Sequence, residues 1–404
     1  METALRLLTA LPRKPGRFLL APALAGGSWL VGHGTPLALE PGAGLEALPH
    51  LLEPGPKGTV VLLGYELGRS LLRRPGRARE DRGLPRAVAI RVEEAVAIDP
   101  ATGRIEGDAA LAGLRGPLPT HPAQRCSVEV SLDRRAHAAA VGRVHELIRA
   151  GETYQTNLTV RFSAPWSTGP EALLPALLTT GPQACTAYLD LPGGASVVSA
   201  SPELLLRYDA ATRLASSEPI KGTRPRGEGA EADEALAAAL AADPKERAEH
   251  VMIVDLVRND LGRVAEVGSV HVPALFRVDR LPTVHHLVSE IAARLAPART
   301  LPELVASLFP AGSITGAPKL RTMEIIDELE PVARGPYCGS IGLVRPDGSC
   351  ALSVAIRTAV LQDGRVDYGA GGGITIDAAA TREWDELVLK ARPFLSAVGA
   401  AAPC

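Results

Sequence analysis

The segment Glu218–Gly227 brings together residue types that could do chemistry. Lys221 supplies a primary amine, and Arg224 and Arg226 follow it with guanidinium groups. Two prolines hold φ at about −65° and two glycines permit positive φ, so the spacing predicts a sharply shaped turn. An amine held there can bind an anion or, once deprotonated, attack carbon, and two guanidinium groups facing it would lower its pKa. The alternative is a solvated basic loop.

Two carboxyl groups stand in surroundings that favour a chemical role. Glu203 lies between two strand patterns, where an apolar setting would raise its pKa and let it act as an acid; a surface position is the alternative. Asp243–Glu246 has the pattern of a cap on a helix that is apolar in nearly every direction, so we expect that helix to be buried. Glu249 within it then needs an ion partner or a metal. The other polar groups of the helix are expected to form a structural network, namely Asp255, Arg258, Asn259 and Asp260.

Two further segments carry polar groups suited to a site. Of the adjacent pair His285 and His286, only one can face a given site from any regular element, and a buried structural histidine is the alternative. The glycine-rich loop Pro310–Lys319 lacks the spacing of a nucleotide-binding P-loop. It runs into a helix expected to begin near Pro318, whose free N–H groups could still receive an anion.

The elements that position these groups show two periodicities. A helix is expected from Asp133 to Ala150, with Gly151 as its stop. A strand follows, with Gln155, Asn157, Thr159 and Arg161 on a polar face that would ordinarily meet solvent.

The C-terminal part predicts an antiparallel meander from Tyr337 to Thr375, with turns at Pro346-Asp347-Gly348 and Asp363-Gly364. Its middle strand carries Arg357 between small residues, which suits bidentate capture of a carboxylate. The glycine run 369–373 could bring bare N–H groups close to an anion. A last helix is expected from about Thr381 until Pro393 stops it. Its site-facing residues would be Glu383, Glu386 and Lys390, although the last two could equally form an exposed ion pair.

The segment Pro219-Ile220-Lys221-Gly222-Thr223 resembles the signature of the chorismate-utilising enzymes, which include the anthranilate, aminodeoxychorismate, isochorismate and salicylate synthases. The resemblance is strong from roughly Ser131 to Pro393 and weak before it. It implies an α+β fold of large, mainly antiparallel sheets packed together with helices outside. We therefore expect an N-terminal region over residues 1–130 and a chorismate-binding catalytic region over residues 131–396.

The resemblance also implies roles for single residues. Lys221 would add to the substrate ring with Glu203 as its acid, and His286 would lie against the ring. Mg²⁺ would be held by Glu249 and Glu386, with Glu383 supporting the metal shell. The expected substrate-binding residues are Gln155, Ser313, Thr315, Tyr337, Arg357, Gly371, Gly372 and Lys390.

Two positions bear on which reaction of the family to expect. Lysine at position 221 is similar to the aminodeoxychorismate synthases, whereas anthranilate synthases generally carry alanine there. Gln155 stands where isochorismate and salicylate synthases carry a lysine that activates water, so the resemblance favours an enzyme that uses ammonia. The expected reaction is Mg²⁺-dependent amination of chorismate at C4 to 4-amino-4-deoxychorismate, on the route to p-aminobenzoate and folate. The alternatives are component I of anthranilate synthase and a non-catalytic subunit that only docks or regulates an amidotransferase.

Composition excludes several other classes. A net charge of −2 and 3% aromatic residues argue against nucleic acid or an anionic membrane as partner. Five cysteines without CxxC spacing suggest neither zinc nor a disulfide framework, and none stands in a glutaminase-type elbow, so a separate glutamine amidotransferase subunit should supply ammonia. Neither a signal-peptide pattern nor an apolar run of about 18 residues is present, and we expect a cytoplasmic protein.

Overall fold

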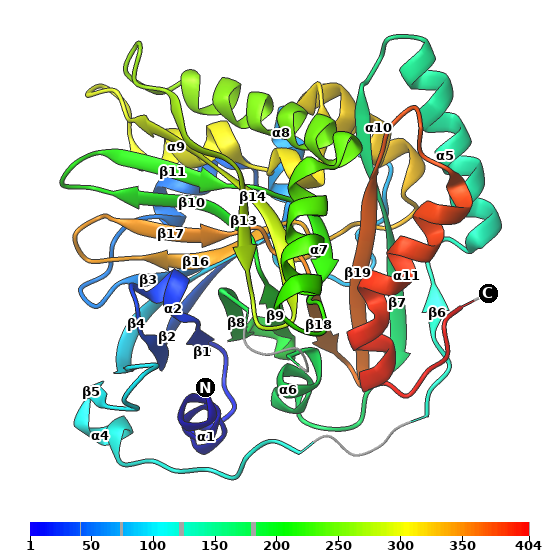
Figure 1. Ribbon diagram of the computed structural model, residues 1–404. Coiled ribbons are helices and arrows are strands. Elements are labelled where there is room, and N and C mark those ends of the chain that lie inside the picture. The colour runs from blue at the N-terminus through cyan, green and yellow to red at the C-terminus, as the bar shows by residue number, and fades with distance from the viewer. Residues whose placement is uncertain (41, 73–75, 121–124, 179–182, 404) are drawn as a thin grey trace.

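The computed structural model describes residues 1–40, 42–72, 76–120, 125–178 and 183–403. Its strands form one continuous network of antiparallel pairings with two ends, which we call the β7 half and the β14 half (Figure 1). N-terminal strands join these halves through β1, which pairs with β8, and β3, which pairs with β16. Helices cover the outside, so the expected fold class is confirmed.

The strands of each part are given in the order in which they pair. The β7 half contains β6 (Glu129–Val130) and β15 (Gly316–Ala317) on one edge of β7 (Gln155–Pro165), then β19 (Arg365–Ile374), β18 (Thr358–Gln362), β9 (Ser196–Ser201) and β8 (Cys185–Asp190). The joining strands are β1 (Arg17–Leu20), β2 (Trp29–Leu39), β4 (Ala87–Ile98) with β5 (Ile105–Gly107), and β3 (Thr59–Leu63). The β14 half contains β16 (Ser340–Val344), β17 (Cys350–Ser353), β10 (Leu204–Asp209), β11 (Leu214–Glu218) and β14 (Val284–Arg294), which also pairs with β12 (Ile220–Pro225) and β13 (His271–Arg280).

Helices flank both halves. In Figure 1, α5 and α11 lie together beside β7 and β19, whereas α8 and α9 lie over the β14 half. The α-helices are α1 (Glu2–Ala10), α2 (Pro22–Ala25), α3 (Leu48–Leu51), α4 (Ala109–Ala112), α5 (Arg134–Arg149), α6 (Leu173–Leu177), α7 (Ala230–Ala242), α8 (Pro244–Gly262), α9 (Leu301–Leu308), α10 (Lys319–Leu329) and α11 (Ala380–Ala397). The 3₁₀ helices are η1 (Leu45–Ala47), η2 (Tyr65–Leu71), η3 (Pro170–Ala172), η4 (Pro192–Gly194) and η5 (Gly312–Ile314). No helix in the described ranges is long and apolar enough to cross a membrane.

The chain passes directly between the two halves at two places that lie side by side. Residues 202–203 connect β9 to β10, and residues 354–357 connect β17 to β18. The Val354 N–H donates to the Glu203 carbonyl at 3.0 Å, and the Ala200 N–H donates to the Arg357 carbonyl at 3.0 Å. Arg357 has φ of 50°, a conformation that costs free energy in a residue with a Cβ and that clusters at functional sites. Both crossings therefore place a chemically useful residue at the junction of the halves.

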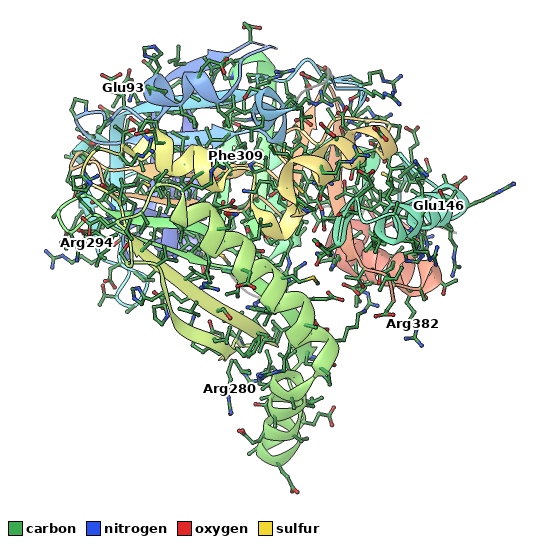
Figure 2. All side chains as sticks on the ribbon, turned by 90° about the horizontal axis from the view of Figure 1, so that it is seen from above. Glu93, Glu146, Arg280, Arg294, Phe309 and Arg382 are labelled. Carbon is green, nitrogen blue, oxygen red and sulfur yellow. The ribbon has the colours of Figure 1, made fainter. Side chains whose placement is uncertain are left out.

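Helix α7 and the β13–β14 hairpin project from the body (Figure 2). Arg280, near the hairpin tip, pairs with Glu234 of α7 at 2.6 Å. The β12 strand pairs with β14 alongside this arm, Thr223 opposite His286.

Local signals for caps and turns are confirmed. Asp243 caps α8 by accepting the N–H groups of Lys245 and Glu246. Gly151 follows α5 with φ of 74°, which an L side chain rarely adopts. Asp363 and Gly364 both have positive φ, as a two-residue hairpin turn requires. No disulfide joins the four described cysteines to one another, and three of them are buried.

Two predictions around the β14 half are wrong. The Lys221 segment forms the strand β12 instead of a turn, because its proline and glycine residues serve a bulge between Ile220 and Thr223 and an edge position. The predicted meander is two hairpins. Its middle strand is broken between Ser353 and Thr358, and Arg357 lies in the crossing.

Burial also departs from the sequence predictions. The polar face of β7 is largely buried, including Gln155 at 1% exposure, because α10 packs against β7 and Glu330 binds Thr159. Helix α8 is buried on one side only: Val251 is 40% exposed, and Asp255 forms a surface pair with Arg258 at 2.7 Å. Asp260 instead forms a buried pair with Lys319 at 2.6 Å.

Two further expectations fail. Pro393 lies inside α11, which continues to Ala397. The basic run 69–82, which contains a proline and a glycine and so predicts an exposed loop, is partly docked: Arg69 pairs with Asp327 of α10 at 2.6 Å. Residues 73–75 of that run lie outside the described residues.

Candidate active site

Lys221 is half-buried on β12, and charged groups from three other elements converge on it. Burial lowers the pKa of its amine, and the nearby Lys390 ammonium lowers it further; Glu249, Glu203 and Glu386 oppose this shift. The expectation that Arg224 and Arg226 lower the pKa of Lys221 is not met. Arg224 pairs with Asp243 at 2.9 Å, and Arg226 pairs with Asp233 at 2.7 Å.

Glu203 lies in the first crossing and is buried. Burial raises the pKa of its carboxyl group to about 7, although Ser313, Lys221 and Arg357 favour the charged form. The Ser313 hydroxyl donates to Glu203 Oε1 at 2.6 Å. A carboxyl group with this pKa can give up a proton near neutral pH, as the sequence predicted for an apolar setting.

The two histidines have different surroundings. Burial, followed by the charge of Arg357, lowers the pKa of His286 to about 4, so its ring is neutral at pH 7. Its Nε2 atom is buried without a hydrogen-bond partner among the described residues. His285 Nε2 instead lies 2.9 Å from Asp233 Oδ1. His286 is therefore the member of the pair next to the site groups.

The glycine strand β19 forms one wall of the site. Both amide atoms of Gln155 are buried without a partner in the described part of the chain, and a Cβ added at Gly373 would collide with that amide. A Cβ added at Gly372 would lie 3.2 Å from Glu383 Oε2 and 3.8 Å from Lys390 Nζ. The backbone here leaves space that only glycine provides.

Three carboxylates face this wall from α8 and α11. Burial raises the pKa of Glu383, and the charge of Glu386 raises it further. Lys390 Nζ lies 2.8 Å from Glu386 Oε1 and chiefly accounts for the lowered pKa of Glu386, while Lys245 Nζ lies 3.7 Å from Glu249 Oε1. Carboxylate oxygens are the ligands that Mg²⁺ prefers, so these residue types suit the ion chemically. Nevertheless, no group of three or more His, Cys, Asp or Glu residues in the described ranges is arranged to hold a metal.

The remaining predicted substrate-binding residues differ in whether their polar groups are already bonded within the protein. The half-buried Arg357 guanidinium approaches Gln183 Oε1 at 3.4 Å, and desolvation lowers its pKa. The Tyr337 ring packs directly on Gly369. The Thr315 hydroxyl donates to the Ala311 carbonyl at 2.8 Å and so supports its own loop, and Lys390 Nζ donates to the Gly371 carbonyl at 3.0 Å.

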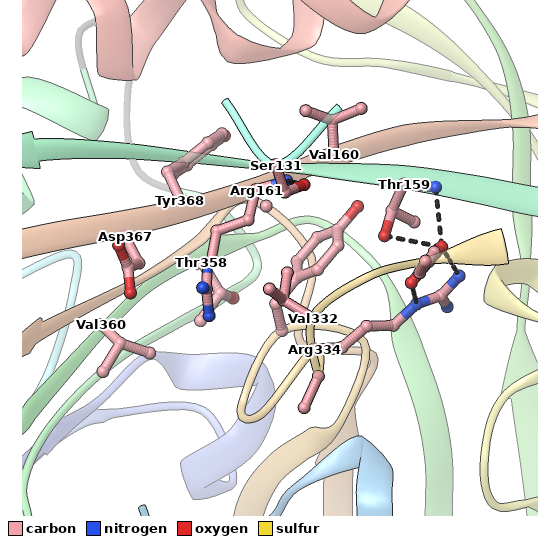
Figure 3. Close-up of a pocket in the computed structure, with 14 residues that line it drawn as sticks. Ser131, Thr159, Val160, Arg161, Val332, Arg334, Thr358, Val360, Asp367 and Tyr368 are labelled. Atoms are coloured by element: carbon pink, nitrogen blue, oxygen red, sulfur yellow. Dashed lines mark hydrogen bonds and ion pairs between the residues drawn. The ribbon is translucent and has the colours of Figure 1, made fainter. Parts of the chain in front are cut away.

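A cavity lies beside the site on the α10 side of β7 and β19 (Figure 3). Its empty volume, including space open to solvent, is about 400 Å³, and it shares Tyr337 with the predicted site. Sequence reasoning missed two of its lining residues, Glu330 and Arg334, which form a buried pair at 2.6 Å. Their i, i+4 spacing was the available signal, but such spacing more often marks an exposed pair.

Residues 39–396 match the family model described as chorismate binding enzyme. The chain therefore belongs to the chorismate-binding enzyme family, and it is a chorismate-utilising enzyme. The match begins well before the region in which the sequence resemblance was strong.

Relatives in this family carry two names. The chain is 41% identical over 359 residues to anthranilate synthase component 1 of Thermus thermophilus, covering 84% of this chain and 77% of that protein. It is 38% identical over 365 residues to aminodeoxychorismate synthase component 1 of Salmonella typhimurium, covering 87% and 80%. In structure it is similar to anthranilate synthase component I of Streptococcus pneumoniae, with a TM-score of 0.78, 28% identity and coverage of 95% and 93%. The menaquinone-specific isochorismate synthase of Escherichia coli shares the fold, with a TM-score of 0.77 and 18% identity over 97% of this chain and 90% of that chain.

Proposed function

We propose that the chain aminates chorismate at C4 and releases 4-amino-4-deoxychorismate, as component I of an aminodeoxychorismate synthase. The observation that carries this proposal is the half-buried amine of Lys221, whose pKa is lowered, within electrostatic reach of the buried Glu203. A neutral amine can attack carbon, and a protonated carboxyl group can release a proton to a departing hydroxyl.

The proposed reaction has two displacement steps. Lys221 forms a C–N bond at C2 of the ring while the C4 hydroxyl leaves with a proton from Glu203. Ammonia then forms a bond at C4 and expels the lysine from C2 as a neutral amine. One proton of the new C4 ammonium group passes to the Glu203 carboxylate. The neutral His286 ring would pack against the substrate ring without adding charge.

Binding of the dicarboxylate substrate is assigned to cations and bare N–H groups. Arg357 and the amides of Gly371 and Gly372 would hold one carboxylate, and Lys390 would approach the same ligand. Mg²⁺, held by Glu249 and Glu386 with Glu383 in support, would neutralise substrate carboxylate charge and favour loss of the hydroxyl. Gln155, Ser313, Thr315 and Tyr337 would complete the pocket.

The second candidate function is component I of anthranilate synthase. Several of the relatives carry that name, among them the Thermus thermophilus protein. Lys221 speaks against it, because the sequence resemblance gives alanine at this position in anthranilate synthases. A non-catalytic role is disfavoured by the assembled site groups.

Ammonia would come from a separate glutamine amidotransferase subunit, and the complex would work in the cytoplasm. Within the chain, residues 131–396 are proposed as the catalytic region. Residues 1–130 would act as the bridge, since their strands β1 and β3 pair with the two halves of the sheet.

Product analysis tests the proposal. The chain is incubated with chorismate, Mg²⁺ and ammonium at alkaline pH, where NH₃ is available. We expect chorismate to be consumed without release of pyruvate, and p-aminobenzoate to form only after an aminodeoxychorismate lyase is added. Fluorescent anthranilate with pyruvate would establish the second candidate instead.

A further inference from the structure

Glu330 and Arg334 form an ion pair whose side chains are only 4% and 2% exposed, respectively. Arg334 Nη2 donates to Glu330 Oε1 at 2.6 Å and its Nε donates to Oε2 at 2.8 Å, so the pair is bidentate. A buried pair of this kind often contributes no more stability than an apolar pair of the same volume, because both charges lose their water. The role of the pair therefore depends on the segments that its remaining hydrogen bonds hold.

Those hydrogen bonds reach two segments of the site. Arg334 Nη1 donates to the Ile314 carbonyl in η5, and Nη2 donates to the Asn157 carbonyl in β7, both at 2.7 Å. Glu330 Oε1 accepts from the Thr159 N–H at 2.8 Å and from its hydroxyl at 2.9 Å. Figure 3 marks the bonds among Thr159, Glu330 and Arg334 at the cavity wall; Ile314 and Asn157 are not drawn in it.

The anchored positions adjoin the chemistry. Ile314 follows Ser313, whose hydroxyl donates to Glu203. Asn157 and Thr159 are the partners of Gly373 and Gly371 in β19. Each anchor is thus one bond or one strand pairing away from a proposed site group.

The backbone and the guanidinium of Arg334 are themselves held in place. Glu66 accepts the N–H groups of Arg334 and Gly335, both at 2.8 Å, and the Arg334 guanidinium lies 4.6 Å from the centre of the Tyr65 ring. The guanidinium therefore has little freedom to follow a shift of η5 or β7, and it acts as a fixed point for both.

We propose that Glu330 and Arg334 are positioning residues that hold the Ser313 hydroxyl on Glu203 and hold β7 in register with the glycine strand, without touching substrate. The importance of Glu203 for turnover rests on the proposed function. The placement of Ser313 does not, since it follows from the hydrogen bonds alone.

The pKa of Glu203 reports whether the Ser313 hydroxyl is placed on its carboxylate. The groups that face its carboxylate are the Ser313 hydroxyl, the Ile220 N–H, the charges of Lys221 and Arg357, and the Cys185 thiol. Loss of the Ser313 hydrogen bond removes a donor that favours the charged form, so the pKa of Glu203 should rise while the other groups stay in place.

The test uses the full chain labelled with ¹³C-glutamate, without substrate. The Glu203 carboxyl signal is identified by its loss in Glu203→Gln and titrated in wild type, in Ser313→Ala and in the apolar double variant Glu330→Leu/Arg334→Met. We expect the double variant to bind the Glu203 proton about threefold tighter or more, a rise of roughly half a pH unit. Ser313→Ala should give a rise of similar size, and adding it to the double variant should give no further rise.

Two other variants keep the test decisive. Arg143→Met/Glu146→Leu removes an exposed ion pair on α5 and should leave the Glu203 titration unchanged. Arg334→Lys keeps the charge but cannot span both carbonyls, so it should raise the pKa even if the double variant fails to fold. A wild-type titration in Arg334→Lys, or in a folded double variant, would refute the positioning role. A wild-type chain that cannot aminate chorismate would refute the proposed function and leave this result intact.

Discussion

At the scale of single residues, burial pushes three groups of one site toward their uncharged forms. It raises the pKa of Glu203 to about 7, lowers that of His286 to about 4, and lowers that of Lys221. A neutral acid beside a neutral amine is the combination that nucleophilic displacement of a hydroxyl requires. Burial moves the proposed acid and the proposed nucleophile toward these states.

The raised pKa of Glu203 predicts a pH-dependent stability cost. The folded protein keeps this carboxyl group protonated up to about pH 7, whereas the unfolded chain ionises near 4.5. The stability present below pH 4.5 is therefore lost as pH rises to 7 and beyond, by roughly 3 kcal/mol in all. Glu203→Gln removes this loss, so its free energy of unfolding relative to wild type should increase between pH 5 and pH 8. Urea unfolding at both values checks this, and an equal difference at both would contradict it.

The Glu249→Gln variant should lose activity without losing stability. The amide keeps the volume but cannot supply a charged oxygen to Mg²⁺, so turnover should fall more than about 100-fold with the melting temperature nearly unchanged. Asp255→Asn, on the exposed side of the same helix, serves as the control and should retain activity. Full wild-type activity in excess chelator would show that no metal is needed.

At the scale of elements, the glycine strand β19 sets the positions of its own backbone amides and leaves space for the Gln155 side chain packed against it. In Gly373→Ala the added Cβ would displace the Gln155 amide, so KM for chorismate should rise by about tenfold or more, since one lost polar contact changes binding by 1 to 2 kcal/mol. Gly142→Ala is the control, because a Cβ there on α5 meets nothing within 4 Å. Equal KM values in the two variants would remove Gln155 from the site.

Local patterns predicted local structure and the motif residues. The cap at Asp243, the stop at Gly151 and the Asp363-Gly364 turn depend on neighbours in sequence, and each could be predicted. The strand conformation of Lys221 could not, because it is decided by pairing with residues more than 60 positions away. The same holds for Arg357, whose place in a crossing depends on strands β9 and β10.

Burial was the least predictable property of the site. The polar face of β7 alternates as a solvated strand would, and only packing by segments distant in sequence buries Gln155, whose amide has no partner among the described residues. Glu203 is the opposite case, since its apolar neighbours in sequence were compatible with a raised pKa, and its burial in the structure raises that pKa. The Glu330–Arg334 pair was missed because its partners Thr159 and Ile314 come from distant segments.

At the scale of the whole molecule, two halves of one continuous sheet network meet where the chain crosses between them. Glu203 and Arg357 occupy those crossings, and β12, β19, α8 and α11 bring the other groups to them. The proposed acid and the proposed carboxylate ligand are thus fixed by the connections of the sheet itself.

The proposed division of labour predicts the nitrogen source. The isolated chain should aminate chorismate with ammonium at alkaline pH and should fail with glutamine until an amidotransferase subunit is added. Comparing rates with the two nitrogen donors, with and without that subunit, checks this. Glutamine-dependent turnover by the pure chain alone would mean that the chain itself hydrolyses glutamine.

The role of Lys221 as nucleophile is tested most directly by replacing it with arginine. A guanidinium binds carboxylates at least as well as an amine but stays protonated throughout the accessible pH range, so it cannot attack carbon. C4 amination should therefore fall at least about 1000-fold in both Lys221→Arg and Lys221→Ala, while calorimetry still detects chorismate binding through Arg357 and the Mg²⁺ carboxylates. A Lys221→Arg enzyme that forms 4-amino-4-deoxychorismate near the wild-type rate would contradict the account and return this lysine to a binding role.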